Sequence, residues 1–321
     1  MDLIYTNAKR VDQGVLTAYA FDLSYGASEN DFEMTLGADE PVLEFGAFAY
    51  MEGTEYGGIV DAMKTSTNGE TITYYGRTWH GILNSKVIEP DAGEDYLTVS
   101  GDANSVLSML IARLGLSALF VAAEELSGVN IAGYQFNRFC KGYDGIRAML
   151  AANNAKLKIV WHDRSVVLSA EPIADYAESP IDGDIATLTV ERHDKKVNHL
   201  ICLGKGELAE REVYHLYVDQ FGRIGNVQYY TGLDEIADTY DNSNAESTAD
   251  LLKGGIERLT ELRNNDKAEI AVPETEGLTY DIGDIVGSKD VKSGVSVAAV
   301  VSQKIVKIAN GAVSTEYKTG E

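Results

Sequence analysis

The sequence predicts a mainly β protein with an α+β insert, in which two related small antiparallel β-barrels flank an α/β insert domain. Gly occurs 31 times and Tyr 18 times among 321 residues but Pro only 5 times, a composition typical of tight turns and aromatic-rich strands. The charge divides the chain into three parts. Asn-Gly pairs stand between strand-like runs in the first and the last of these parts, which is a strong hairpin signal.

The charge map sets the predicted domains. The net charge of −23 is made of −12 in residues 1–98, +1 in residues 99–172 and −12 in residues 173–321. Pro90 and Pro172 stand near the two changes, where Pro often marks a break. We therefore expect a first β-barrel domain over 1–98, an α+β insert domain over 99–172 and a second β-barrel domain over 173–321, with an inserted helix near 243–263.

The first part is expected to consist of strands. Phe32, Met34 and Leu36 alternate with polar neighbours, as in a half-buried strand. Asn68-Gly69 separates two runs that suit a hairpin. The predicted strands of this part are 15–23, 32–36, 59–65, 71–75 and 79–88.

The insert is expected to hold two helices and a hairpin. Asp102 or Asn104 can cap a helix with apolar residues three and four apart up to Leu114, and a second helix ends near Asn153-Asn154. Two strands, 157–161 and 166–170, then meet across Asp163-Arg164.

The third part returns to strands around one helix. Ser243 and Glu246 have capping-box spacing ahead of that helix, and Gly254-Gly255 inside it indicates a kink or a weak helix. The predicted strands are 185–190, 198–203, 212–218, 282–286, 295–301, 304–308 and 312–317. The distance from Asn68 to Tyr75 equals that from Asn310 to Tyr317, so the two outer parts are either related barrels or alike by chance.

Composition excludes several classes of function. A strongly acidic surface disfavours stable binding to nucleic acid or to anionic lipid. No apolar run approaches the ~20 residues of a membrane-spanning helix, and the N-terminus does not resemble a signal peptide. Cys140 and Cys202 are the only cysteines, so we expect no disulfide scaffold and synthesis in a cytoplasm.

Residues that could carry chemistry form no recognisable motif. His193 and His199 are six residues apart on a predicted extended stretch, which is too far to bind one metal ion unless the chain turns. The other histidines are His80, His162 and His215, and none of them has a ligand partner at zinc-site spacing. Cys140 precedes His162 and Asp163 without a thiol-protease signature, which favours a structural cysteine. We therefore expect no catalytic, cofactor-binding or metal-binding residues, and no cofactor.

Three weaker signals also favour structural roles. Gly204-Lys205-Gly206 fits a strand connection better than a phosphate loop. The acidic series 234–241 fits a solvated turn better than a calcium loop. Trp79 and Trp161 could stack on sugars, but tryptophans in strand patterns usually belong to the core.

Three segments resemble a known family when they are taken in order. The first is Tyr75-Gly76-Arg77-Thr78 with Gly81-Ile82-Leu83, and the last is Tyr280-Asp281-Ile282-Gly283-Asp284-Ile285-Val286-Gly287 with Gly294. Between them lies Asn198-His199-Leu200-Ile201-Cys202-Leu203-Gly204-Lys205-Gly206-Glu207-Leu208, then Arg211-Glu212-Val213-Tyr214-His215-Leu216-Tyr217 and Gly222. Over nearly the whole chain the sequence is similar to bacteriophage tail-hub proteins, the siphovirus tail-tip family related to contractile-tail baseplate hubs and to the base of VgrG-type spikes.

The resemblance implies a fold and an assembly. The family fold has two similar barrels and an α/β insert, and three chains form a ring that meets a hexameric tail tube. The implied partners are the tail tube or distal tail protein, the tape-measure protein and spike or fibre proteins. The implied location is the virion tail tip.

We therefore expect a non-enzymatic virion component, a tail-tip or baseplate hub that joins the tube to the spike or fibre apparatus and leaves a passage for DNA. The acidic parts are expected to line that passage, or alternatively to serve solubility on the outer surface, and the insert to sit at the periphery or at protein contacts. No peptidase or glycosidase module fits after the second barrel, so cell-wall hydrolysis is expected to belong to a partner. The alternative is a tail-borne or secreted carbohydrate-active enzyme or sugar-binding protein built of β-barrel modules.

Overall fold

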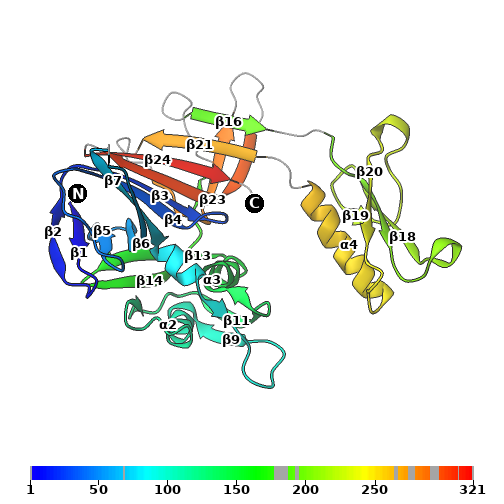
Figure 1. Cartoon of the computed structure of the whole chain (residues 1–321). Helices are drawn as coiled ribbons and strands as arrows, with labels where there is room; N and C mark the ends of the chain where they lie inside the picture. Colours follow the sequence, from blue (N-terminus) through cyan, green and yellow to red (C-terminus); the bar gives the residue numbers. More distant parts are fainter. Residues whose placement is uncertain are drawn as a thin grey trace. The chain divides into compact units, whose positions relative to one another are not determined.

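The computed structural model describes residues 2–67, 69–176, 187–191, 195–263, 267–273, 279–289, 296–309 and 311–319. The chain is mainly β and forms two compact units (Figure 1). Unit 1 comprises the described residues up to Thr189 and from Ala268 to Thr319, and unit 2 comprises those from Val190 to Lys267. Within the described residues, no helix is long and apolar enough to cross a membrane.

The first part of unit 1 consists of seven strands followed by one short helix. In chain order these are β1 Leu3–Thr6, β2 Asp12–Leu16, β3 Tyr19–Gly26, β4 Asp31–Gly37, β5 Phe48–Tyr50, β6 Gly57–Thr65, β7 Thr71–Thr78 and α1 Trp79–Asn84. The predicted alternation is confirmed in β4, where Phe32, Met34 and Leu36 are buried. The predicted strand 15–23 is divided between β2 and β3.

The prediction of a strand over residues 79–88 is wrong, because these residues form α1 and then the short strand β8 (Val87–Ile88). The Thr78 hydroxyl accepts a hydrogen bond from the Gly81 amide and caps the helix. Trp79, Ile82 and Leu83 then fall on one buried helical face. The apolar residues of so short a run fit either a helix or a strand. The Thr78 cap and the packing of the buried face determine that the helix forms.

Residues 98–172 contain the two predicted helices and the predicted hairpin, together with short strands that were not predicted. Its elements are β9 Thr98–Asp102, α2 Ala103–Arg113, β10 Phe120–Ala122, β11 Asn130–Gln135, β12 Cys140–Lys141, α3 Gly142–Ala151, β13 Ala155–His162 and β14 Ser165–Pro172. The Asp102 carboxylate accepts from the Asn104 amide at 3.0 Å and caps α2. Asp163 and Arg164 both have positive φ, the geometry that a two-residue turn between β13 and β14 requires.

The last part of unit 1 returns to strands. They are β15 Asp175–Tyr176, β16 Thr187–Glu191, β21 Lys267–Pro273, β22 Ile285–Lys289, β23 Ser296–Ala309 and β24 Ala312–Thr319. The prediction of two strands over 295–301 and 304–308 is wrong, since β23 runs through both segments. An irregularity between Val301 and Gln303 lets the ladder to β24 continue across the polar residues that suggested a break.

The strand order of the large sheet contains a repeat. Five strands in the first part pair in the order β3-β4-β7-β6-β5, and five in the last part pair in the order β16-β21-β24-β23-β22. We number the strands of each set from 1 to 5 in chain order. In both sets the neighbours across the sheet then follow the same order, 1-2-5-4-3. The two sets join because β3 also pairs with β23, with Leu23 opposite Val306. One core contains Phe21 and Met34 from the first set and Val306 and Ile308 from the second.

The two predicted Asn-Gly turns fall at the same place in this repeat. Gly69 lies in the turn between β6 and β7, and Gly311 in the turn between β23 and β24, the fourth and fifth strands of each set. Asn68 and Asn310 themselves lie outside the described residues. The hairpins are confirmed, whereas the closure of each set into a barrel stays a prediction.

Unit 2 is a sheet covered on one face by a helix. Its elements are β17 His199–Leu203, η1 Leu208–Glu210, β18 Val213–Val218, β19 Ile224–Gly225, η2 Gly232–Asp234, β20 Ala237–Asp241 and α4 Thr248–Arg263. The helix begins at Thr248, later than the predicted residue 243. It is capped by Ser247, whose hydroxyl accepts a hydrogen bond from the Asp250 amide at 3.2 Å. The predicted capping pair of Ser243 and Glu246 is therefore wrong. The core comprises Leu200, Cys202, Leu216, Val218, Ala245, Leu251 and Leu259.

The glycine pair inside α4 allows the helix to approach the sheet closely. A Cβ atom on Gly255 would lie 2.5 Å from the sulfur of Cys202 and 3.1 Å from a methyl group of Leu216. One on Gly254 would collide with Tyr240. The glycines are therefore explained by packing, and the helix runs continuously from Thr248 to Arg263.

We expect Gly255→Ala to destabilise unit 2 by about 1–3 kcal/mol, because the added methyl group forces the helix away from Cys202. Gly225→Ala is the matched control, since no atom lies within 4 Å of its new Cβ position. Urea denaturation followed by circular dichroism measures both. Equal effects of the two substitutions would contradict the close-packing explanation.

Candidate functional site

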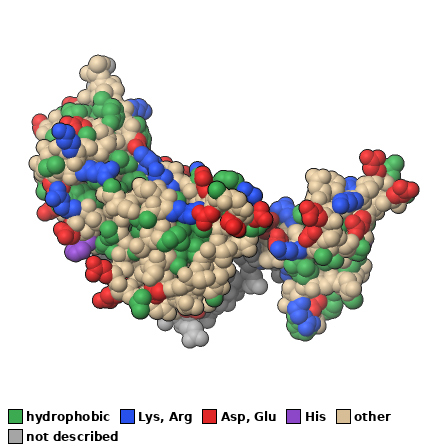
Figure 2. Space-filling view, turned by 90° about the horizontal axis from the view of Figure 1, so that it is seen from below, with side chains coloured by type: hydrophobic (Ala, Val, Ile, Leu, Met, Phe, Trp, Pro, Cys, Tyr) green, Lys and Arg blue, Asp and Glu red, His purple; other side chains and the backbone are tan. Residues whose placement is uncertain are grey.

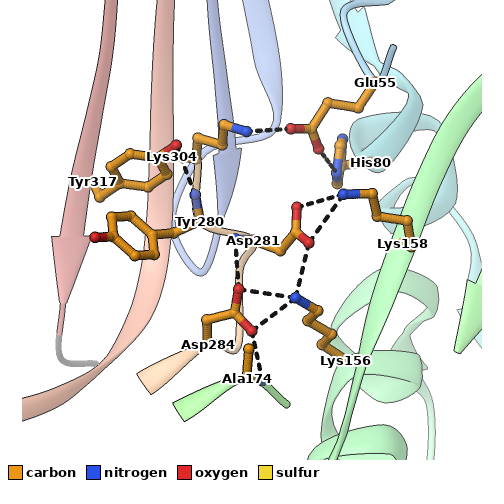
Figure 3. Close-up of polar contacts among 10 residues, drawn as sticks. All are labelled: Glu55, His80, Lys156, Lys158, Ala174, Tyr280, Asp281, Asp284, Lys304 and Tyr317. Carbon is orange, nitrogen blue, oxygen red and sulfur yellow. Dashed lines mark hydrogen bonds and ion pairs between the residues drawn. The ribbon is translucent and has the colours of Figure 1, made fainter. Parts of the chain in front are cut away.

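The most connected polar feature of unit 1 is a buried set of charged side chains, here called the charge network (Figure 3). It draws on the loop before β6, on α1, on β13, on the turn before β22 and on β23. Its members are Glu55, His80, Lys156, Lys158, Asp281, Asp284 and Lys304.

One branch joins the insert to the turn before β22. The Lys156 ammonium lies 2.8 Å from Oδ1 of Asp284 and 2.9 Å from Oδ2 of Asp281. Lys158 donates to both oxygens of Asp281 at 2.8 and 3.0 Å. Asp284 is 1% exposed and also accepts from the backbone amides of Ala174 and Asp281, each at 2.9 Å. Both lysines lie on one face of β13, so strand alternation aims them at the same turn.

The second branch joins β23 to the first part of the chain. Lys304 is 4% exposed, and its ammonium lies 2.7 Å from the Glu55 carboxylate. It also sits 5.8 Å from the ring centre of Tyr56 and 5.7 Å from that of Tyr317. The Tyr317 hydroxyl accepts from the Tyr280 amide at 3.1 Å, which fixes the turn that carries Asp281. Lys304 is thus held by one carboxylate and two aromatic faces.

The electrostatics of the network favour the charged forms of Lys156, Lys304 and Asp281. Burial by itself lowers the pKa of a lysine, but the Glu55 carboxylate outweighs this and raises the pKa of Lys304. Lys156 behaves in the same way, because its bonds to Asp281 and Asp284 raise its pKa against burial. Burial would raise the pKa of Asp281, yet the two lysines lower it.

His80 is the neutral member. It is fully buried, and desolvation lowers its pKa to about 4 although Glu55 lies 3.6 Å away. Its ring packs at 4.5 Å on Tyr25 and edge-on at 5.2 Å against Tyr143. At neutral pH three lysines therefore face three carboxylates, and the charges of the network cancel.

Unit 2 contains a smaller polar chain. Nδ1 of His199 lies 2.6 Å from a Glu235 oxygen, and its Nε2 lies 2.8 Å from Nδ1 of His215. His199 also stacks on Tyr217 at 4.4 Å. The carboxylate orients one imidazole and that imidazole orients the next, which is a stable hydrogen-bonded arrangement without a nucleophile. The pair of His199 and His215 was not predicted from the sequence, where only His193 and His199 were considered together. His215 lies beside His199 only because β17 pairs with β18. His193 lies outside the described residues.

The other residues singled out in the sequence are structural. Trp79 and Trp161 are 0% and 3% exposed and stack on each other at 5.0 Å, so neither presents a ring to a sugar. Burial raises the pKa of both Cys140 and Cys202, which disfavours the reactive thiolate. His162 pairs with Glu52 at 3.3 Å. Residues 204–206 connect β17 to β18, as predicted.

The acidic series 234–241 does not converge on one point. Glu235 bonds His199, while Asp241 pairs with Arg211 at the other end of β20. In the part of the chain that the structure describes, no three His, Cys, Asp or Glu side chains lie close enough together to hold a metal ion. The absence of catalytic, cofactor-binding and metal-binding residues stays a prediction.

Comparison with known proteins identifies the fold. No protein-family model matches the sequence, and no curated protein matches it either. The 43 kDa tail protein of prophage MuSo2 from Shewanella oneidensis matches with a TM-score of 0.58 and 13% identity, over 100% of this chain and 98% of that one. The tail protein from Neisseria meningitidis MC58 matches with a TM-score of 0.54 and 14% identity, over 100% and 96%.

A chain of the phage P2 baseplate in its activated conformation matches with a TM-score of 0.51 and 10% identity, over 99% of this chain and 98% of that one. The protein therefore has the fold of phage tail and baseplate proteins. The family resemblance predicted from sequence is confirmed at this level.

We expect Lys156→Met to destabilise unit 1 by about 3–5 kcal/mol, because it leaves the buried Asp284 carboxylate without a cation. Arg77→Met is the control, since it breaks an exposed pair with Asp61 and should cost only about 0.2–1 kcal/mol. Urea unfolding at pH 7 measures both. If the two substitutions lowered the free energy of unfolding by similar amounts, the buried ion pairs of the network would stabilise the fold no more than an exposed pair does.

We expect acid to destabilise the fold through His80. The pKa is about 4 in the folded chain and about 6.5 when unfolded, so the unfolded state binds the proton first and stability falls as the pH drops through this window. His80→Phe should remove about 2 kcal/mol of the difference in unfolding free energy between pH 7 and pH 4.5. His162→Phe, at a side chain 72% exposed, should leave that difference unchanged. An unchanged pH dependence in His80→Phe would refute the assignment.

Proposed function

We propose that the protein is a structural virion component, the tail-tip or baseplate hub that joins a tail tube to the spike or fibre apparatus. The observation that carries the proposal is the match of the whole chain to whole tail proteins, over 100% of this chain and 96% to 98% of the two tail proteins. Its place would be the virion tail tip, after synthesis in the cytoplasm of a bacterial host. Its partners would be the tube or distal tail protein, the tape-measure protein and spike or fibre proteins.

A homotrimer suits the repeated strand order. Each chain carries two five-strand sets with the same order, so three chains present six such sets around one axis. A three-fold ring could thereby match a six-fold tube without a change of sequence. In this proposal each set belongs to a barrel, the domains are 1–98, 99–172 and 173–321, and the ring leaves a passage for DNA lined by acidic side chains that phosphate does not bind.

The role proposed is mechanical and not enzymatic. The charge network supports this, because each of its charged members is engaged by an opposite charge within the fold. Against the alternative of a sugar-binding protein, Trp79 and Trp161 are buried against each other and present no ring to a sugar.

Light scattering and native mass spectrometry of the purified full chain test the proposal. We expect a trimer, and class averages in electron microscopy that show a three-fold ring with a central opening. A protein that stays monomeric at high micromolar concentration, or that alone cleaves peptidoglycan, would overturn the assignment.

A further inference from the structure

A short basic and aromatic segment of the insert carries three features that the fold of one chain does not explain. This segment, here called the basic strap, consists of Arg138, Phe139 and Lys141 between β11 and α3. It is fixed by β12, where Lys141 lies opposite Val87 and the Gly142 amide donates to the Lys86 carbonyl. The strap is therefore a defined surface.

Two positions of the strap are unfavourable for the isolated chain. Phe139 has a φ of 54°, in the left-handed region that aromatic residues rarely adopt, and its side chain is 58% exposed. Lys141 occupies the N-cap of α3 without a side-chain hydrogen bond, where Asp or Ser would stabilise the helix and a cation opposes its dipole. Such local costs persist where a contact outside the fold compensates for them.

The strap's charges also lack partners. Among the described residues, neither Arg138 nor Lys141 forms an ion pair, and the same holds for a few other surface cations such as Arg10 and Arg147. The one charged contact of Arg138 is its guanidinium over the Phe139 ring at 5.5 Å. The strap therefore places two exposed cations beside an exposed aromatic ring, in a chain of net charge −23.

The surface continues into a groove. An open groove of about 440 Å³ is lined by Lys86, Val87, Glu89, Pro90, Asp91, Arg113 and Leu114. It adjoins the strap, because its lining residue Val87 lies opposite Lys141 in the pairing of β8 with β12. Figure 2 shows Lys and Arg side chains exposed on this face of unit 1 among hydrophobic and acidic ones.

We infer that the basic strap is the insert's contact with a second copy of this chain, and that it docks on an acidic part of that copy, within residues 1–98 or 173–321. The inference rests on the proposed homotrimer. A three-fold ring needs two different surfaces on each chain, since each copy meets its neighbours head to tail. A basic patch repels itself but suits the −12 segments of the next copy, so it opposes two-fold pairing and favours ring closure.

The variant Phe139→Gly/Lys141→Asp separates this role from a structural one. Gly relieves the positive φ and Asp can cap α3, so the isolated chain should be at least as stable as the parent. The trimer should nevertheless dissociate at more than about tenfold higher concentration, as expected when an interface anchor is lost. Analytical ultracentrifugation and urea unfolding provide the two measurements.

Phe221→Gly/Arg223→Asp is the matched control. It removes an equivalent exposed Phe and cation, two residues apart, from unit 2, where the Arg223 guanidinium lies 5.0 Å from the Phe221 ring. Because Arg223→Asp makes residues 173–321 more acidic, it does not weaken an acidic docking surface, and trimer dissociation should stay unchanged.

A photo-crosslinking benzoylphenylalanine at position 139 identifies the occupant. We expect a crosslink between copies that maps to residues 1–98 or 173–321. Crosslinks to the insert of the other copy, or an unaltered trimer in Phe139→Gly/Lys141→Asp, would overturn the inference and leave the trimer standing. Binding of duplex DNA that is lost in this variant, with the trimer intact, would assign the strap to DNA and overturn it as well. A parent protein that is monomeric throughout would overturn both the strap contact and the proposed trimer.

Discussion

The fold of unit 1 depends on the pairing of Lys156 with Asp284 and Asp281. These side chains are 128 and 125 residues apart in sequence, and burial of Asp284 is tolerable only when the lysine is in place. The pair therefore fixes the turn before β22 against β13 of the insert. Lys304 and Glu55 do the same between β23 and the first part of the chain. Two buried contacts thus hold three sequence segments in one unit.

This arrangement explains why the two strand sets behave as one body. The pairing of β3 with β23 joins them edge to edge, and the charge network ties the second set to the insert from the other side. Because the charges cancel, the network adds rigidity without leaving a reactive group exposed.

Much of the fold could be predicted from sequence because its signals are local. Strand alternation in β4, the cap of α2 and the Asn-Gly turns depend on neighbouring residues, and these predictions are confirmed. The segment 79–88 was mispredicted as a strand because its helix depends on packing around Trp79. The charge network was missed because nothing near Lys156 indicates Asp284, and because Lys156 fell just outside the predicted strand 157–161 that holds Lys158. The pairing of His199 with His215 likewise appears only once β17 and β18 are in register.

If the charge network holds unit 1 together, the insert and the last strands of the unit open together. Native-state hydrogen exchange at increasing urea concentration tests it directly, because it reports the opening free energy of each amide. We expect the most protected amides of β13 and β23 to exchange with the same free energy and the same urea dependence. If β13 opened separately, with a lower free energy and a smaller urea dependence than β23, the network would not be the constraint that holds the unit together.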